Sequence, residues 1–152
     1  GIGQCCVLYG GTLLFLDFAY PAPATGYVLS LAAMILTDLS VTAVGLYISA
    51  LLKKSESAIL PVLLIIIMQV VFCDSLFALS GAASWMRYLT PAAWGIAVFS
   101  NACDINGWAP EIYQKEMFGY SPLIGLGVLL LFTALFVLFT ILRLKRAYRN
   151  QE

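Results

Sequence analysis

The sequence predicts an all-α polytopic membrane protein with four transmembrane helices and an external helical segment that is re-entrant or interfacial. Three observations support this fold class. Of the 152 residues, 62% are hydrophobic and 11% are charged, whereas a soluble domain has about half apolar and about a quarter charged residues. The apolar residues stand in long unbroken blocks, which is typical of bilayer proteins. Clusters of basic residues follow two of these blocks.

Four apolar blocks are the predicted spans. The last three exceed the ~30 Å hydrocarbon core at about 1.5 Å of rise per helical residue. The first block is shorter and begins at residue 1 without a charged leading region, so we interpret it as a cut helix and not as a signal peptide. The spans lie at about 2–18, 27–52, 58–80 and 122–142.

Basic residues predict the orientation of the spans. Lys53 and Lys54 separate the second span from the third, and "RLKRAYR" follows the fourth. With four crossings, both clusters fall on one side, which the positive-inside rule assigns to the cytoplasm. The tail 143–152 is then cytoplasmic and the segment 82–121 is external. We expect a multi-pass protein of the plasma membrane, or of the inner membrane in a bacterium.

The external segment carries local structural signals. Trp85, Tyr88 and Trp94 are aromatic residues typical of the membrane interface, and Pro91 interrupts their run. We expect short helices here, packed on the outer ends of the spans, because backbone at membrane depth must be covered by protein. After this segment, Ser121–Pro122 predicts a helix start, with a capping residue followed by proline at the first helical position.

Two acidic residues fall inside predicted spans. Asp38 lies near the middle of the second span, where a charge costs roughly 2.5–3.5 kcal/mol on insertion, and Asp74 lies near the outer end of the third. The face of Asp38 continues with Thr42, Gly45 and Ser49, all at helical offsets. This small and polar stripe favours close packing of helices. A proton or substrate role for Asp38 is the alternative.

The composition excludes several classes of function. The chain has no histidine, which excludes histidine metal sites, Ser-His triads and histidine proton relays. Its net charge is zero and it has no basic stripe, so we expect no nucleic-acid partner. It contains no GxSxG, HExxH or GxxxxGKS/T motif, and its cysteines have no zinc-ligand spacing. We therefore predict no catalytic residue, no metal site and no ATP hydrolysis by this chain itself.

Two consecutive stretches resemble the late part of an ABC exporter membrane domain of the White (ABCG) class and its bacterial relatives. They are "LTDLSVTAVGLYISALLKKSESAILPVLLIIIMQVVFCDSLFALSG" and "SWMRYLTPAAWGIAVFSNACDIN". In that family, a W-x-x-Y-x-x-P-x-x-(aromatic)-G segment re-enters the membrane from outside. The matching positions here are Trp85, Tyr88, Pro91, Trp94 and Gly95. The resemblance covers nearly the whole chain, as the third to sixth of the family's six spans.

The resemblance implies a function and a set of partners. The chain would be a permease part of an ATP-driven exporter, forming the path for an amphipathic or lipid-like substrate by alternating access. A second membrane half, in a homodimer, and a nucleotide-binding ATPase domain, fused or separate, would complete the transporter. ATP and Mg²⁺ would bind that partner domain, and this chain would hold no cofactor.

The resemblance also implies which residues line the path. The family's fifth helix, here 58–79, lies near the two-fold axis, and a gate near its outer end falls on Leu76 and Phe77. Below the gate, one helical face would meet the substrate: Leu64, Met68, Val71 and Ser75. The alternative is that these are ordinary core or lipid-facing residues. The chain departs from the family in placing Asp74 beside the gate and in having one cysteine in the external loop.

Two other functions stay open on the sequence alone. Four spans with few charges also fit a small membrane scaffold or assembly subunit without a transport path. A proton-coupled carrier that uses Asp38 and Asp74 is the third option. A Walker motif encoded upstream or nearby would favour the exporter, whereas dependence on a proton gradient would favour the carrier.

Overall fold

The computed structural model describes residues 1–15, 23–52, 59–73, 81–108 and 119–149. The secondary structure in these ranges is helical, as the sequence predicts, and no strand occurs in them. In chain order, the elements are α1 (Ile2–Phe15), α2 (Pro23–Leu51), α3 (Ile59–Phe72), the 3₁₀ helix η2 (Gly81–Leu89), α4 (Pro91–Ala102), α5 (Ile105–Trp108) and α7 (Pro122–Arg149).

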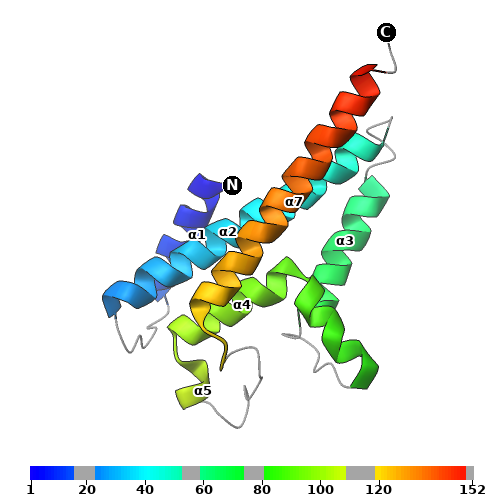
Figure 1. The fold of residues 1–152 in the computed structure, drawn as a ribbon. Helices are drawn as coiled ribbons and strands as arrows, with labels where there is room; N and C mark the ends of the chain where they lie inside the picture. The colour runs from blue at the N-terminus through cyan, green and yellow to red at the C-terminus, as the bar shows by residue number, and fades with distance from the viewer. Residues whose placement is uncertain (16–22, 53–58, 74–80, 109–118, 150–152) are drawn as a thin grey trace.

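The long helices α2 and α7 form the main body of the fold. Figure 1 shows them side by side and running in the same direction, so that their C-terminal ends lie at one end of the molecule. They have 29 and 28 residues, or a little over about 40 Å each. Two segments of them are long and apolar enough to cross a membrane, Ala24–Leu51 and Pro122–Ala147.

The two shorter apolar helices do not reach that length in the described residues. α1 and α3 have 14 residues each, which corresponds to about 21 Å against a hydrocarbon core of ~30 Å. Residues 74–80, which belong to the predicted third span, lie outside the described ranges. The structure thus has two candidate spans among the described residues, and four crossings stay a prediction.

Residues 81–102 form a bent pair of short helices. Thr90 occupies the N-cap position of α4 and Pro91 begins the helix, so the break predicted at Pro91 is confirmed. Figure 1 shows η2 and α4 meeting at an angle beside the C-terminal end of α3. The Thr90 hydroxyl lies 3.2 Å from the Phe72 carbonyl oxygen and 2.8 Å from that of Arg87. These hydrogen bonds tie the bend to α3.

The hydrophobic core lies where α4 crosses α2 and α7. At its centre are Trp94, which is 8% exposed, and Leu129, which is fully buried. The Trp94 indole N–H donates a hydrogen bond to the Tyr88 carbonyl oxygen at 2.9 Å, so the buried donor has a partner. Further core and neighbouring residues are Ala93, Ala97, Leu36, Ile96, Val128 and Phe132.

Two glycines allow α4 to approach both long helices. A side chain at Gly95 of α4 would overlap Thr37 of α2, and one at Gly125 of α7 would overlap Val98 of α4. Both glycines are buried. Helices in a bilayer associate through such close packing, because lipid provides no hydrophobic drive between them.

A buried serine joins α2 to α7. Ser40 is fully buried, and its hydroxyl lies 2.9 Å from the Leu129 carbonyl oxygen and 3.0 Å from the Thr133 hydroxyl. It also lies 2.8 Å from the carbonyl oxygen of Leu36, one turn earlier in α2. Hydrogen bonds of this kind are the polar contacts that hold membrane helices together.

The packing face of α2 differs from the predicted one. Thr42 and Ser49 are exposed, and a Cβ built on Gly45 meets nothing within 4 Å. The small residues that are buried on α2 are Ser30, Ala33, Ser40 and Ala43. α2 therefore has two faces on which small residues recur with helical spacing. The positions of α4 and α7 determine which of the two faces is buried. Among the described residues of this chain, the part of the predicted stripe at Thr42, Gly45 and Ser49 is therefore not a helix-packing face.

Candidate functional site

The predicted path residues on α3 are accessible. Leu64 is 56% exposed and Met68 is 40% exposed, while Val71 is partly buried. α3 as a whole has no buried residue among those described. This very apolar helix therefore covers little of the core and leaves most of its surface for other contacts.

The opposite face of α3 is turned toward the rest of the chain. It lines a pocket of about 370 Å³ together with Val41 of α2 and with Ala92 and Ile96 of α4. α3 contributes Ile66, Gln69 and Val70 to this pocket, and Cys73, directly after the helix, completes its lining. Because a helix turns by about 100° per residue, Leu64 and Met68 point away from these contacts. The predicted path face is thus directed away from α2 and α4.

The predicted gate falls outside the described residues. This concerns Asp74, Ser75, Leu76 and Phe77, so their assignment stays a prediction. The residues directly before them are anchored, because Thr90 bonds to the last residue of α3. The backbone that leads into the predicted gate is therefore attached to the bend between η2 and α4.

Asp38 lies on the wall of a pocket between α2 and α4. The pocket has a volume of about 430 Å³, and Asp38 is partly buried there. Its lining consists of Ala33, Met34, Thr37, Asp38, Ala92, Gly95, Ile96 and Phe99. Asp38 is the charged member of this set, and the other residues are apolar apart from Thr37. An ionisable side chain on a helix that is long and apolar enough to span a membrane is a candidate functional residue.

The aromatic motif is assembled around the start of α4. The Tyr88 and Trp94 rings are 6.0 Å apart, and Trp94 stacks on Tyr120 at 6.3 Å. Pro91 is buried next to them. Trp85, by contrast, is 57% exposed on η2. Most of the motif therefore holds α4 in place, while Trp85 stays available at the surface.

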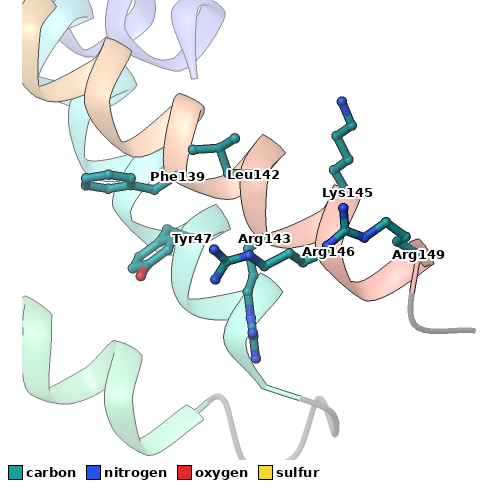
Figure 2. Close-up of a pocket in the computed structure, with 7 residues that line it drawn as sticks. All are labelled: Tyr47, Phe139, Leu142, Arg143, Lys145, Arg146 and Arg149. Atoms are coloured by element: carbon teal, nitrogen blue, oxygen red, sulfur yellow. The ribbon is translucent and has the colours of Figure 1, made fainter.

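A third pocket lies near the C-terminal ends of α2 and α7, and sequence analysis did not identify it. It has a volume of about 450 Å³ and contains four cationic side chains. Figure 2 shows its lining: Tyr47, Phe139, Leu142, Arg143, Lys145, Arg146 and Arg149. The run "RLKRAYR" indicated only an orientation. Tyr47 comes from α2, and no sequence pattern joins it to α7.

The described residues contain no group of three or more potential metal ligands among His, Cys, Asp and Glu. The chain matches no model of a known protein family, no curated protein and no solved structure. Its most informative features are therefore the two long apolar helices, the bent segment between them, the open face of α3 and the pockets.

Proposed function

We propose that this chain is the membrane-spanning permease part of an ATP-driven ABC exporter. The observation that carries the proposal is the bent η2–α4 segment, packed against two parallel helices that are each long and apolar enough to span a membrane. A short aromatic helix pair in this position fits the re-entrant segment of the exporter class that the sequence resembles. In this arrangement the η2–α4 segment would pack against the external halves of the two spans α2 and α7.

The distance between the bend and the basic residues supports this placement. α4 contacts α7 at Gly125, and the first cation of the basic pocket is Arg143. These positions are about 18 residues apart, which corresponds to about 27 Å of helix, close to the ~30 Å thickness of the hydrocarbon core. With the cations in the cytoplasm, α4 would lie at the external boundary of the membrane.

The exposed face of α3 supports a two-fold path. Two copies of the chain would meet with their α3 helices near the axis, so that Leu64 and Met68 face the substrate. Such a surface is apolar and accessible in the single chain, which suits an amphipathic or lipid-like molecule. The predicted gate, Leu76 and Phe77, would close this path on the external side.

Energy for transport would come from a nucleotide-binding partner. ATP and Mg²⁺ would bind that domain, and ATP binding would draw the two membrane halves together. The substrate would move because its affinity differs between inward-facing and outward-facing states. This chain would supply the wall and the gate, and the partner would supply hydrolysis.

Purification from native membranes tests the proposal. The tagged chain, isolated in a mild detergent, is expected to carry Mg²⁺-dependent ATPase activity that orthovanadate inhibits. Met68→Trp, which fills the proposed path, is expected to change the stimulation of that activity by amphipathic compounds. The matched variant Ile66→Trp alters the other face of α3 and is expected to leave the stimulation nearer to wild type. A stable assembly without any ATPase activity would contradict the exporter function.

A proton-coupled carrier is the second candidate, favoured by the pocket that Asp38 lines. In that case Asp38→Asn would abolish transport, since the amide cannot take up and release a proton. Transport would follow an imposed pH gradient in vesicles without ATP. An exporter would instead need ATP and would be less sensitive to the gradient.

A further inference from the structure

The basic pocket is rich in positive charge. Its four cations lie within the seven residues 143–149 of α7, and all four residues are exposed. Among the described residues, no acidic side chain lines the pocket, and none of the four cations forms an ion pair. This concentration of like charge favours an anionic occupant.

The inner wall of the same pocket is aromatic and apolar. The Tyr47 ring lies 5.8 Å from the Phe136 ring and 5.9 Å from the Phe139 ring, between centroids. Leu142 continues this wall toward the cations. Tyr47 is therefore held in place by rings of α7, and no described residue shares a hydrogen bond with its hydroxyl. Figure 2 shows the Tyr47 ring below the Phe139 ring, with arginine side chains of α7 beside it.

We infer that this pocket binds the phosphate headgroup of an anionic phospholipid, from the leaflet on the side of the C-terminal ends of α2 and α7. Guanidinium groups match phosphate oxygens in geometry and can donate two hydrogen bonds to one phosphate. The Tyr47 hydroxyl provides a further donor. Basic pockets between membrane helices on the cytoplasmic side bind such headgroups. The apolar wall accommodates the glycerol and the first part of the acyl chains.

The composition of the pocket favours a lipid over an acidic protein surface. The pocket changes from apolar residues at Phe139 and Leu142 to cations within one helical turn, which follows the change from acyl chain to headgroup in a phospholipid. An acidic protein would need the cations but not the apolar wall. A lipid held here would contact Tyr47 of α2 and the arginines of α7, and would thereby link the two long helices.

Lipid binding to the purified full-length protein tests this inference. Native mass spectrometry would compare phosphatidylglycerol, which is anionic, with phosphatidylcholine, which has a phosphate but no net charge. The wild type is expected to retain phosphatidylglycerol preferentially and to gain thermal stability from it. The triple variant R143Q/R146Q/R149Q is expected to bind phosphatidylglycerol with an affinity that is lower by a factor of at least about ten. Tyr47→Phe is expected to cause a smaller loss.

The control variant is Arg87→Gln, which removes a cation on η2 outside the pocket and is expected to bind like the wild type. Circular dichroism and gel filtration would verify the folding of each variant, and the single variant Arg146→Gln replaces the triple one if that fails to fold. Equal binding of both lipids by the wild type, or unchanged binding by a folded pocket variant, would overturn the inference. So would competition by inorganic phosphate at equal concentration, which would indicate a free-anion site.

One further outcome separates a lipid site from a protein site. Loss of a copurifying ATPase from the triple variant, with phosphatidylglycerol binding unchanged, would identify the cations as a docking surface for protein and overturn the lipid site. The lipid measurement uses no nucleotide and records no transport. Its failure is therefore distinguishable from a failure of the proposed exporter function.

Discussion

At the residue scale, small side chains bring α2, α4 and α7 together. Gly95 and Gly125 remove the side chains that would separate α4 from its neighbours. Ser40 places a hydroxyl between α2 and α7, and its small side chain lets the two helices stay close together. Helices that lie in lipid gain their association energy from packing and from interhelical hydrogen bonds. These positions should therefore be the most sensitive ones in the fold.

Gly125 and Gly127 form a matched pair on one helix. A Cβ at Gly125 would overlap Val98, whereas a Cβ at Gly127 meets nothing within 4 Å. Gly125→Leu is therefore expected to destabilise the protein by about 1–3 kcal/mol through overpacking. Gly127→Leu shares the same gain in helix propensity and is expected to be neutral or slightly stabilising. Unfolding in detergent, followed by circular dichroism, measures both. Equal stabilities of the two variants would contradict the α4–α7 contact.

Ser40→Ala tests the polar contact between α2 and α7. Removing its hydroxyl takes away the bonds to the Leu129 carbonyl and the Thr133 hydroxyl. The expected loss of stability is about 0.6–1.7 kcal/mol, the range of hydrogen bonds between membrane helices. A double-mutant cycle with Thr133→Val should show coupling. Thr140→Ala is the control, because its hydroxyl bonds to its own helix at Phe136. Additive effects of the first pair would disprove the contact.

Sequence analysis could recognise small polar residues on α2 but not which of them are buried. Ser40 belongs to one face, while Thr42 and Ser49 belong to another, and both faces have helical spacing. The choice depends on where α4 and α7 lie, which is tertiary information. Asp38 stands out in the sequence as an acidic residue within an apolar stretch, and the structure places that stretch in α2. The pocket beside Asp38 is lined in part by Gly95 and Ile96 of α4. The sequence could not predict that these residues lie near Asp38.

At the element scale, helix starts were more predictable than helix ends. Pro91 and Pro122 both begin helices, because proline is favoured at the first helical position and lacks a donor that would be needed later. The last span was predicted to end at residue 142, where the charges begin, but α7 continues to Arg149. Cations near a helix C-terminus interact favourably with the helix dipole. Charge marks the expected edge of the membrane there, and the helix extends beyond it.

Cysteine cross-linking tests the orientation of α3. In a chain whose four native cysteines are replaced by alanine, Met68→Cys is expected to form a disulfide-linked dimer on oxidation, since its face would meet the second copy. Ile66→Cys lies on the face toward α2 and α4 and is expected to stay monomeric. Ile66 is 50% exposed and Met68 40% exposed, so exposure alone would predict the opposite order. Denaturing gels of oxidised membranes report the result. Efficient cross-linking through position 66 alone would refute the proposed interface.

At the scale of the whole molecule, the parallel course of α2 and α7 agrees with the basic residues. Their C-terminal ends lie together, as expected if "RLKRAYR" and the end of the second span share one side of a membrane. The sequence could therefore predict the relative direction of these helices. It could not predict that Tyr47 lines one pocket with the arginines of α7, nor that α4 packs against both helices. Those contacts join segments far apart in the chain, and no local pattern specifies them.

The most direct test of the account is the sidedness of η2 and of the C-terminal end of α7. Single cysteines at Trp85, which is 57% exposed, and at Arg149 would be treated with a membrane-impermeant maleimide in the cysteine-free chain. We predict that Trp85→Cys is labelled in intact cells and that Arg149→Cys is labelled only after the membrane is permeabilised. Labelling of both positions from the same side, or of Trp85→Cys from the cytosol alone, would contradict a permease whose aromatic segment faces outward.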